Sequence, residues 1–179
     1  MHTRLHGWSA VACVLAAACL AAPAVAAAAP VTKSSRITQN GIGSLRIGMT
    51  IDDAQRRTGQ TIDYQRFDPA SDTCGIGRLM PTSLGVTMQT TDRRIAVLSV
   101  SQPGISTRRG IEVGDSVRDL RRAYGSRLRS RVNKYDPKAR DYILRFGNRK
   151  MIFWTDPKRV VRQIDGGRRP EIDYVEGCA

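Results

Sequence analysis

The sequence predicts an α+β protein of two similar half-domains, each a short helical element packed on an antiparallel β-sheet. The first observation behind this prediction is an internal repeat, because residues 44–59 align without a gap with residues 110–125. The second is that both copies carry the same signals for the beginning and end of a short helix. The third is that β-prone runs separated by turn residues follow each copy. A long unit that occurs twice indicates a duplicated small domain rather than a repeat array.

Each copy of the repeat predicts a helix of about two to three turns, which is too short to persist without a sheet to pack on. A hydroxyl residue stands at the N-cap, a carboxylate follows three residues later, and a glycine that tolerates the left-handed conformation ends the helix. The N-cap residue, the carboxylate and the glycine are Thr50, Asp53 and Gly59 in the first copy. In the second copy they are Ser116, Asp119 and Gly125.

The opening of the first copy resembles that of the BamE (SmpA/OmlA) outer-membrane lipoproteins, and it is similar to the tandem repeats of the β-lactamase inhibitory protein. The matching residues of the first copy are Leu45, Ile47, Gly48, Met49, Thr50, Ala54 and Gly59. The second copy matches at Gly114, Ser116, Leu120 and Gly125 and lacks the Met-Thr pair. The resemblance implies short helices on an antiparallel sheet. It carries over no partner-binding residue, because those lie outside the motif.

The first residues have the pattern of a secretory signal peptide over 1–26, with Arg4 as the charged start, an apolar core over 8–20 and a small-residue cleavage site at 24–26. We therefore expect a periplasmic or extracellular protein. A loose lipobox before Cys19 leaves lipidation at that residue as one alternative. A segment that stays uncleaved as a membrane anchor is another. Contact with a membrane is expected only through a lipid anchor at Cys19.

Removal of this segment takes away both histidines, His2 and His6, so the mature chain has no imidazole for a Ser-His or Cys-His pair or for a metal site. Cys74 and Cys178 remain, and in an exported chain they are expected to form a disulfide. By closing a loop of about 105 residues, this bond would contribute ~4–5 kcal/mol in the chain-entropy model. Two free reactive thiols are the alternative.

The chain is strongly basic, with a formal net charge of +13. Such a balance favours anionic partners, among them lipid headgroups, phosphorylated polysaccharide and an acidic protein face. Nucleic acid is an unexpected partner for an exported protein that carries no RNA-binding signature. An Arg-rich composition that follows a GC-rich genome explains the same charge, and composition alone does not separate the two.

The first half reads as a helix followed by strands. Residues 61–67 alternate in part and fit a strand or an ordered loop, whereas 68–75 have the composition of a loop. A hairpin is predicted from the β-prone runs at 85–90 and 95–100. The predicted order is a signal peptide at 1–26, a polar lead-in at 27–43, a first half at 44–103 and a second half at 104–179.

The second half carries the most suggestive binding residues. Arg127, Arg129 and Arg131 alternate with smaller side chains, and in an extended chain they would lie on one face as a cationic ladder able to bind phosphates or carboxylates. The alternative is an edge strand whose charges prevent association with other edges.

A meander of strands is predicted at 142–146, 150–155 and 160–164. Tyr142 and Trp154 are candidates for a binding platform, with packing in the core as the alternative.

No catalytic constellation, cofactor motif or metal-binding spacing stands out, so the sequence predicts a protein that is not an enzyme. We expect a non-catalytic protein that binds a protein or an anionic envelope component, either in envelope assembly or as an inhibitor. The alternative is a small hydrolase of cell-wall or other anionic polymer that uses a carboxylate pair. The candidate carboxylates are Asp63, Asp68, Asp72, Asp136 and Asp141.

Overall fold

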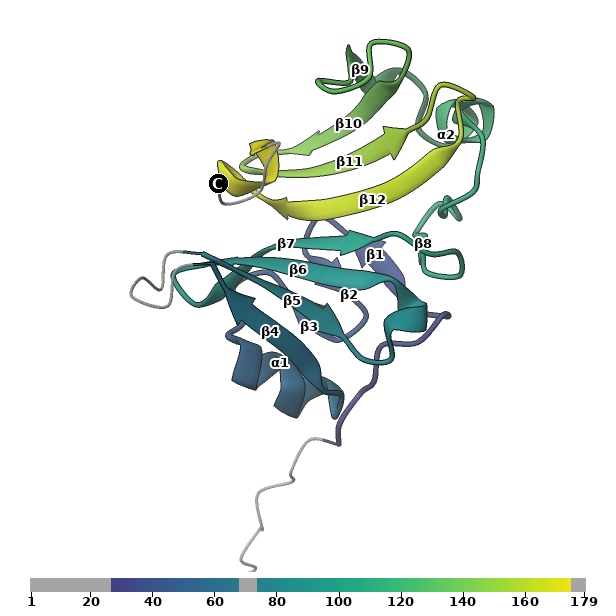
Figure 1. Cartoon of the computed structure of the whole chain (residues 1–179). Helices are drawn as coiled ribbons and strands as arrows, with labels where there is room; N and C mark the ends of the chain where they lie inside the picture. Colours follow the sequence, from purple (N-terminus) through teal and green to yellow (C-terminus); the bar gives the residue numbers. More distant parts are fainter. Residues whose placement is uncertain (1–26, 68–73, 175–179) are drawn as a thin grey trace, which may run out of the picture.

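The computed structural model describes residues 27–67 and 74–174, which form a mostly β, α+β fold with two short α-helices (Figure 1). The main sheet has eight antiparallel strands in the order β4-β5-β6-β7-β12-β11-β10-β9. Its strands in chain order are β4 (Ile62–Arg66), β5 (Gly75–Leu79), β6 (Val86–Thr91), β7 (Arg94–Val100), β9 (Arg129–Val132), β10 (Arg140–Phe146), β11 (Arg149–Thr155) and β12 (Val161–Arg168).

A smaller sheet has the order β3-β2-β1-β8. Its strands are β1 (Arg36–Thr38), β2 (Gly41–Ile42), β3 (Leu45–Arg46) and β8 (Ser106–Thr107). The helices are α1 (Ile51–Thr58) and α2 (Val117–Tyr124), and the 3₁₀ turns are η1 (Thr82–Leu84), η2 (Gly125–Arg127) and η3 (Glu171–Asp173). None of the helices in the described ranges has the length and apolar composition needed to span a bilayer.

Both predicted helices form, and their N-caps have the expected geometry. The Thr50 hydroxyl accepts the Asp53 N–H at 3.1 Å, and the Ser116 hydroxyl accepts the Asp119 N–H at 3.2 Å. In return each hydroxyl donates to the carboxylate of the same aspartate. These hydrogen bonds are the main reason that the pKa of both aspartates lies below its usual value. Gly59 ends α1 in the left-handed conformation with φ of 68°.

The two parts of the chain make matching backbone contacts. The Gly48 N–H donates to the Ile95 carbonyl at 2.7 Å, and the Gly114 N–H, 66 residues later in the chain, donates to the Val161 carbonyl at 2.9 Å. The order of elements also matches, with α1-β4-β5-β6-β7 followed by α2-β9-β10-β11-β12. Each helix is therefore attached in the same way to the last strand of its own set of four.

The predicted hairpin and meander are present. β6 and β7 are joined at Asp92 and Arg93, which both have positive φ, as a type I′ turn requires. The meander of β10, β11 and β12 pairs in that order. β12 continues to Arg168, beyond the end at residue 164 that the sequence indicated.

The segment 27–43 differs from the polar lead-in that the sequence predicted. It contains β1 and β2, and it buries Val31, Ile37 and Ile42 almost completely. β1 pairs in parallel with β8, which lies some seventy residues later in the chain. The periodicity of two- and three-residue strands is too short to show in the sequence, so only this distant pairing reveals them.

The two faces of the main sheet are covered differently. On one face lie α1, α2 and the small sheet, and the large core there includes Leu45, Ala54, Leu120 and Phe153. We call the opposite surface the helix-free face. It carries a smaller apolar cluster of Ala96, Val97, Ile143, Ile152 and Ile172, with Trp154 packed against it. Ile172 belongs to η3, so this 3₁₀ turn covers part of the helix-free face.

The eight strands form one sheet because β7 pairs with β12 at the centre. Gly166 and Gly167 lie in this pairing, opposite Leu98 and Val97. A Cβ atom on Gly166 would lie 2.2 Å from the Thr38 carbonyl oxygen of β1, and one on Gly167 would lie 2.6 Å from the Ala96 carbonyl oxygen. Glycine is therefore required where the small sheet and β7 approach β12.

Replacement of Gly166 by alanine should destabilise the fold. The new methyl group would have to displace the backbone of β1, and such overpacking costs about 1–3 kcal/mol. Urea denaturation should show this as a lower midpoint with an unchanged slope. Arg145→Ala, at an exposed position of β10, is the control and should change the stability by less than about 0.5 kcal/mol. If Gly166→Ala is as stable as the wild type, this account of the sheet centre is wrong.

Candidate functional site

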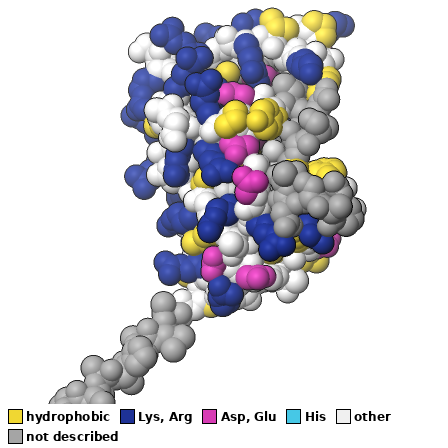
Figure 2. All heavy atoms as spheres, turned by 90° about the vertical axis from the view of Figure 1, so that its left-hand side faces the viewer, with side chains coloured by type: hydrophobic (Ala, Val, Ile, Leu, Met, Phe, Trp, Pro, Cys, Tyr) yellow, Lys and Arg dark blue, Asp and Glu magenta, His cyan; other side chains and the backbone are white. Residues whose placement is uncertain are grey.

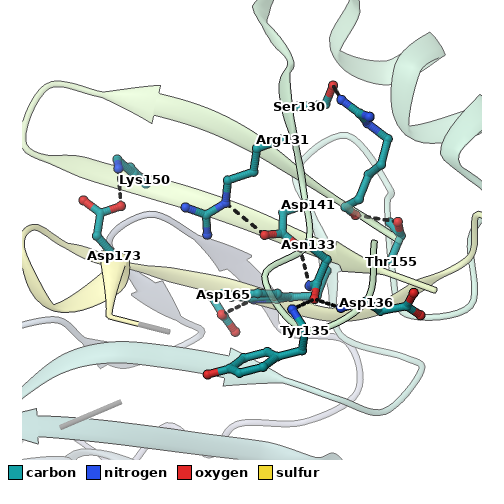
Figure 3. Close-up of polar contacts among 12 residues, drawn as sticks. Ser130, Arg131, Asn133, Tyr135, Asp136, Asp141, Lys150, Thr155, Asp165 and Asp173 are labelled. Carbon is teal, nitrogen blue, oxygen red and sulfur yellow. Dashed lines mark hydrogen bonds and ion pairs between the residues drawn. The ribbon is translucent and has the colours of Figure 1, made fainter. Parts of the chain in front are cut away.

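On the helix-free face, Arg131 of β9 forms an ion pair with Asp141 of β10 (Figure 3). The Arg131 Nε donates to one oxygen of Asp141 at 2.9 Å, and the Asn133 amide donates to the other at 2.8 Å. Asp141 is only 1% exposed, whereas Arg131 is half-buried. The Arg131 guanidinium also lies 6.0 Å from the centre of the Trp154 ring. These contacts hold a cation and an aromatic ring in fixed positions at the surface.

A second carboxylate, Asp165 of β12, lies on the same face. One of its oxygens accepts from the Trp154 indole N–H, and the other accepts from the Gln163 amide at 2.8 Å. Burial of Asp165 raises the pKa of its carboxyl, and the charge of Asp141 raises it further. Hydrogen bonds from Ser99, Trp154 and Gln163 oppose this rise without cancelling it. Trp154 thus touches both clusters through its ring and its N–H.

The turn η3 makes three ion pairs, of which Arg169–Asp173 is the most exposed. Lys150, which is buried, pairs with Asp173. Arg168 donates to Oε1 of Glu171 through Nε and Nη2, at 3.1 and 2.8 Å. Burial alone would raise the pKa of Asp173, but the hydrogen bonds and charges of Lys150 and Arg169 outweigh it and lower the pKa. The Lys150–Asp173 and Arg168–Glu171 pairs are partly buried, so removal of one partner from either pair would leave a poorly solvated charge.

The predicted ladder of three arginines is not formed. Arg129 and Arg131 pair with Ile143 and Asp141 and lie together on the helix-free face. Arg127 lies in η2, before the strand begins, and its guanidinium is 5.6 Å from the ring of Phe146, which packs on the helix-covered core. The 3₁₀ turn breaks the alternation that an extended chain would have kept, so two of the three arginines share a face.

Tyr142 and Trp154 do not form one platform, because they lie on opposite faces of the sheet. Tyr142 is 3% exposed in the helix-covered core, where Arg121 of α2 lies 5.6 Å from its ring. The sequence offered core packing as the alternative for both aromatic residues, and Tyr142 takes it. Trp154 keeps part of its surface open on the helix-free face.

Some predicted residues lie outside the described part of the chain. Cys178 is one of them, so the disulfide between Cys74 and Cys178 stays a prediction. Asp68 and Asp72 are also outside it. In the described ranges 27–67 and 74–174, no three His, Cys, Asp or Glu residues come close enough together to hold a metal ion.

Sequence reasoning missed Asp165, Lys150, Glu171 and Gln89. Asp165 follows the end that the sequence predicted for its strand and precedes two glycines, which signal a break when read along the chain. Asp141, one of the candidate carboxylates named from the sequence, is buried. Alternation places a residue on a face of a strand, but it does not tell which strand lies beside it.

A separate basic surface lies at the start of α2. It lines a depression of about 490 Å³ formed by Ser116, Val117, Arg118, Arg121, Lys158 and Arg159. No ion pair in the described residues joins these four cations to a carboxylate. Figure 2, which shows the left-hand side of the view in Figure 1, likewise shows many more Lys and Arg than Asp and Glu side chains. The positive charge of the sequence is thus present on the surface as extended basic areas.

The fold and this face define a class of β-rich α+β protein with a single large antiparallel sheet, one side of which is mostly free of helices. No protein-family model matches the chain, and no curated protein matches it by sequence. Its fold is similar to that of the uncharacterized protein YfeY from Escherichia coli, with 12% identity and a TM-score of 0.52. This match covers 74% of the chain and 99% of YfeY. At this identity the likeness concerns the fold alone.

Two further solved structures match at lower TM-scores. One is an extracellular protein containing an SCP domain from Bacillus anthracis, with 9% identity, a TM-score of 0.48 and coverage of 69% of this chain and 44% of that one. The other is a DUF4309 family protein, YjgB, from Bacillus subtilis, with 15% identity, a TM-score of 0.46 and coverage of 76% and 89%. None of the three names the families that the repeat motif resembles, so that resemblance stays a prediction.

The raised pKa of Asp165 gives a pH dependence with a defined sign. Its folded pKa lies above the usual 3.8, so the folded state holds the proton more tightly than the unfolded state. Asp165 therefore lowers the free energy of unfolding as the pH rises above about 3.8. Asp165→Asn should become progressively more stable relative to the wild type over this range, as measured by denaturation at a series of pH values.

Asp173→Asn is the comparison with the opposite sign. The pKa of the Asp173 carboxyl is lowered in the folded state. The wild-type carboxylate therefore stabilises the fold above the usual pKa of 3.8, and this effect is lost as the pH falls. The asparagine variant should therefore be less stable than the wild type near neutral pH and approach it in acid. A stability difference between Asp165→Asn and the wild type that is constant with pH would contradict the assignment for Asp165.

Proposed function

We propose that this is an exported, non-catalytic protein that binds a protein or an anionic envelope component through the helix-free face of β9, β10 and β11. The observation that carries the proposal is the position of the Arg131 guanidinium over the Trp154 ring, where a hydrogen bond to Asp141 holds it. Arg129, two residues earlier on the same strand, is exposed beside it. Arginine and tryptophan that are held in place before binding lose little freedom on association, and they are common among the residues that contribute most to binding.

The charge of the surface supports an anionic partner or an acidic protein face. The basic depression at the start of α2 and the arginines of β9 add to a net charge of +13 over the whole sequence. Positive surfaces of this kind accelerate association with negative partners and make it sensitive to salt. Binding to a polyanion should therefore weaken when salt is added, whereas a packed protein interface should persist.

Export and duplication belong to the same proposal. The segment 1–26 has the features of a signal peptide, and we place the mature protein in the periplasm or outside the cell, with the Cys74–Cys178 disulfide closed. The matching caps of α1 and α2 and the matching hydrogen bonds of Gly48 and Gly114 support two halves derived from one ancestral unit. The resemblance to the BamE lipoproteins and the inhibitory protein adds to this, without assigning an activity.

One observation favours the alternative, a hydrolase with a carboxylate pair. Asp141 and Asp165 share a face, and the pKa of Asp165 is raised, as the general acid of such an enzyme requires. Against this, all four carboxylate oxygens accept hydrogen bonds from side chains of the protein, and Arg131 neutralises Asp141. If the purified protein hydrolyses a wall polymer and Asp165→Asn abolishes the turnover, the hydrolase replaces our proposal.

The binding proposal predicts that Arg129→Glu weakens capture of the partner from native envelope by at least about tenfold, since an exposed charge beside Arg131 on the proposed face is reversed. Arg57→Glu, an exposed arginine on α1, is the matched control and should bind like the wild type. Quantitative pull-down with the oxidised protein, at low and high salt, measures both. Equal capture by Arg129→Glu and the wild type would overturn the placement of the binding face.

A further inference from the structure

A small pocket lies on the helix-free face where η3 meets the middle of the sheet. Its volume is about 180 Å³, and it is distinct from the surface of Arg129 proposed above as the partner interface. The residues that matter for its chemistry come from β6, β7, β11, β12 and η3, and they are Gln89, Val97, Trp154, Asp165, Glu171 and Ile172.

Two polar atoms of this wall lack a partner within the protein. The Gln89 Nε2 and the Glu171 Oε2 are both buried, and neither has a hydrogen bond in the described residues. Glu171 is 5% exposed, and its other oxygen takes both donors of Arg168, so Oε2 is the oxygen without a partner. An unsatisfied buried group costs about 1–3 kcal/mol, so two of them in one pocket wall require an explanation.

The two atoms need opposite hydrogen-bond partners, so a group that satisfies both must donate as well as accept. Gln89 Nε2 is a donor and needs an acceptor, whereas Glu171 Oε2 is an acceptor and needs a donor. A phosphate or carboxylate would satisfy Gln89 but would be repelled by Glu171. An ammonium group would satisfy Glu171 but would leave Gln89 without an acceptor. A hydroxyl group is both donor and acceptor, so neighbouring hydroxyls satisfy the two sites together.

The rest of the wall suits a carbon ring that carries such hydroxyls. Val97, Ile172 and the Trp154 ring present apolar surface to the C–H groups of the ring, and Asp165 adds a further polar group. The volume of about 180 Å³ is below the roughly 300–1,000 Å³ of pockets that hold drug-sized ligands, so it matches the size of one ring.

We propose that this pocket binds a single neutral, polyhydroxylated ring, such as one pyranose sugar unit, with Gln89 and Glu171 as its hydrogen-bonding residues. The site shares Trp154 with the proposed partner interface, but its lining includes neither Arg129 nor Arg131.

The test is a titration of the purified protein with glucose, galactose, mannose and N-acetylglucosamine, followed by the NMR signal of the Trp154 indole N–H. At least one of these sugars should shift the signal saturably. Glu171→Gln, which places an amide donor where the acceptor stood, should weaken binding at least about tenfold. Gln89→Met removes the donor and should weaken it to a similar extent. The matched control is Gln65→Met, at an exposed position of β4, which should bind like the wild type.

The backbone NMR spectrum of each variant shows whether it is folded. If Glu171→Gln does not fold, the comparison of sugar affinity with the wild type is made with Gln89→Met. Inorganic phosphate and methylammonium are titrated in parallel as probes of the two charged classes. The proposal is overturned if none of the four sugars shifts the Trp154 signal, if either charged probe shifts it in their place, or if folded Gln89→Met binds the sugar as tightly as the wild type does.

Discussion

The pairing of β7 with β12 is the contact on which the rest of the structure depends. The hydrogen bonds between these two strands join β4-β5-β6-β7 to β12-β11-β10-β9 in one sheet of eight strands. Only the absence of side chains at Gly166 and Gly167 lets the small sheet and β7 approach β12 so closely. Because η3 follows directly after β12, the same pairing also decides what covers the helix-free face.

The polar groups of the helix-free face follow from this arrangement. Asp141, Asp165 and Lys150 are buried by strands on both sides, and a buried charge must be paired or hydrogen-bonded. Their partners come from neighbouring strands and from η3, so each side chain is fixed by a contact distant in sequence. A face built in this way is rigid before any partner arrives, which favours binding by lowering the entropy that must be lost.

The two proposed sites use different chemistry on one face. Around Arg129 and Arg131 the surface offers positive charge and an aromatic ring, which suits a large partner that is negative or acidic. Around Gln89 and Glu171 it offers one donor and one acceptor in a small pocket, which suits a neutral ring with hydroxyl groups. Trp154 lies between the two, with its ring under Arg131 and its N–H on Asp165, so a ligand at one site has a physical route to affect the other.

The sequence by itself determined the local elements: the capped helices at Thr50 and Ser116, the hairpin at Asp92 and the meander that follows Arg140. Caps, turns and alternation act over a few residues, so they can be read along the chain. Tertiary structure alone decided that β1 pairs with β8, that Arg127 leaves the face of Arg129 and Arg131, and that Asp165, Gln89 and Glu171 line one pocket. The physical reason is that burial and pairing partners depend on strands far apart in sequence, and alternation gives the face of a residue but not its neighbour.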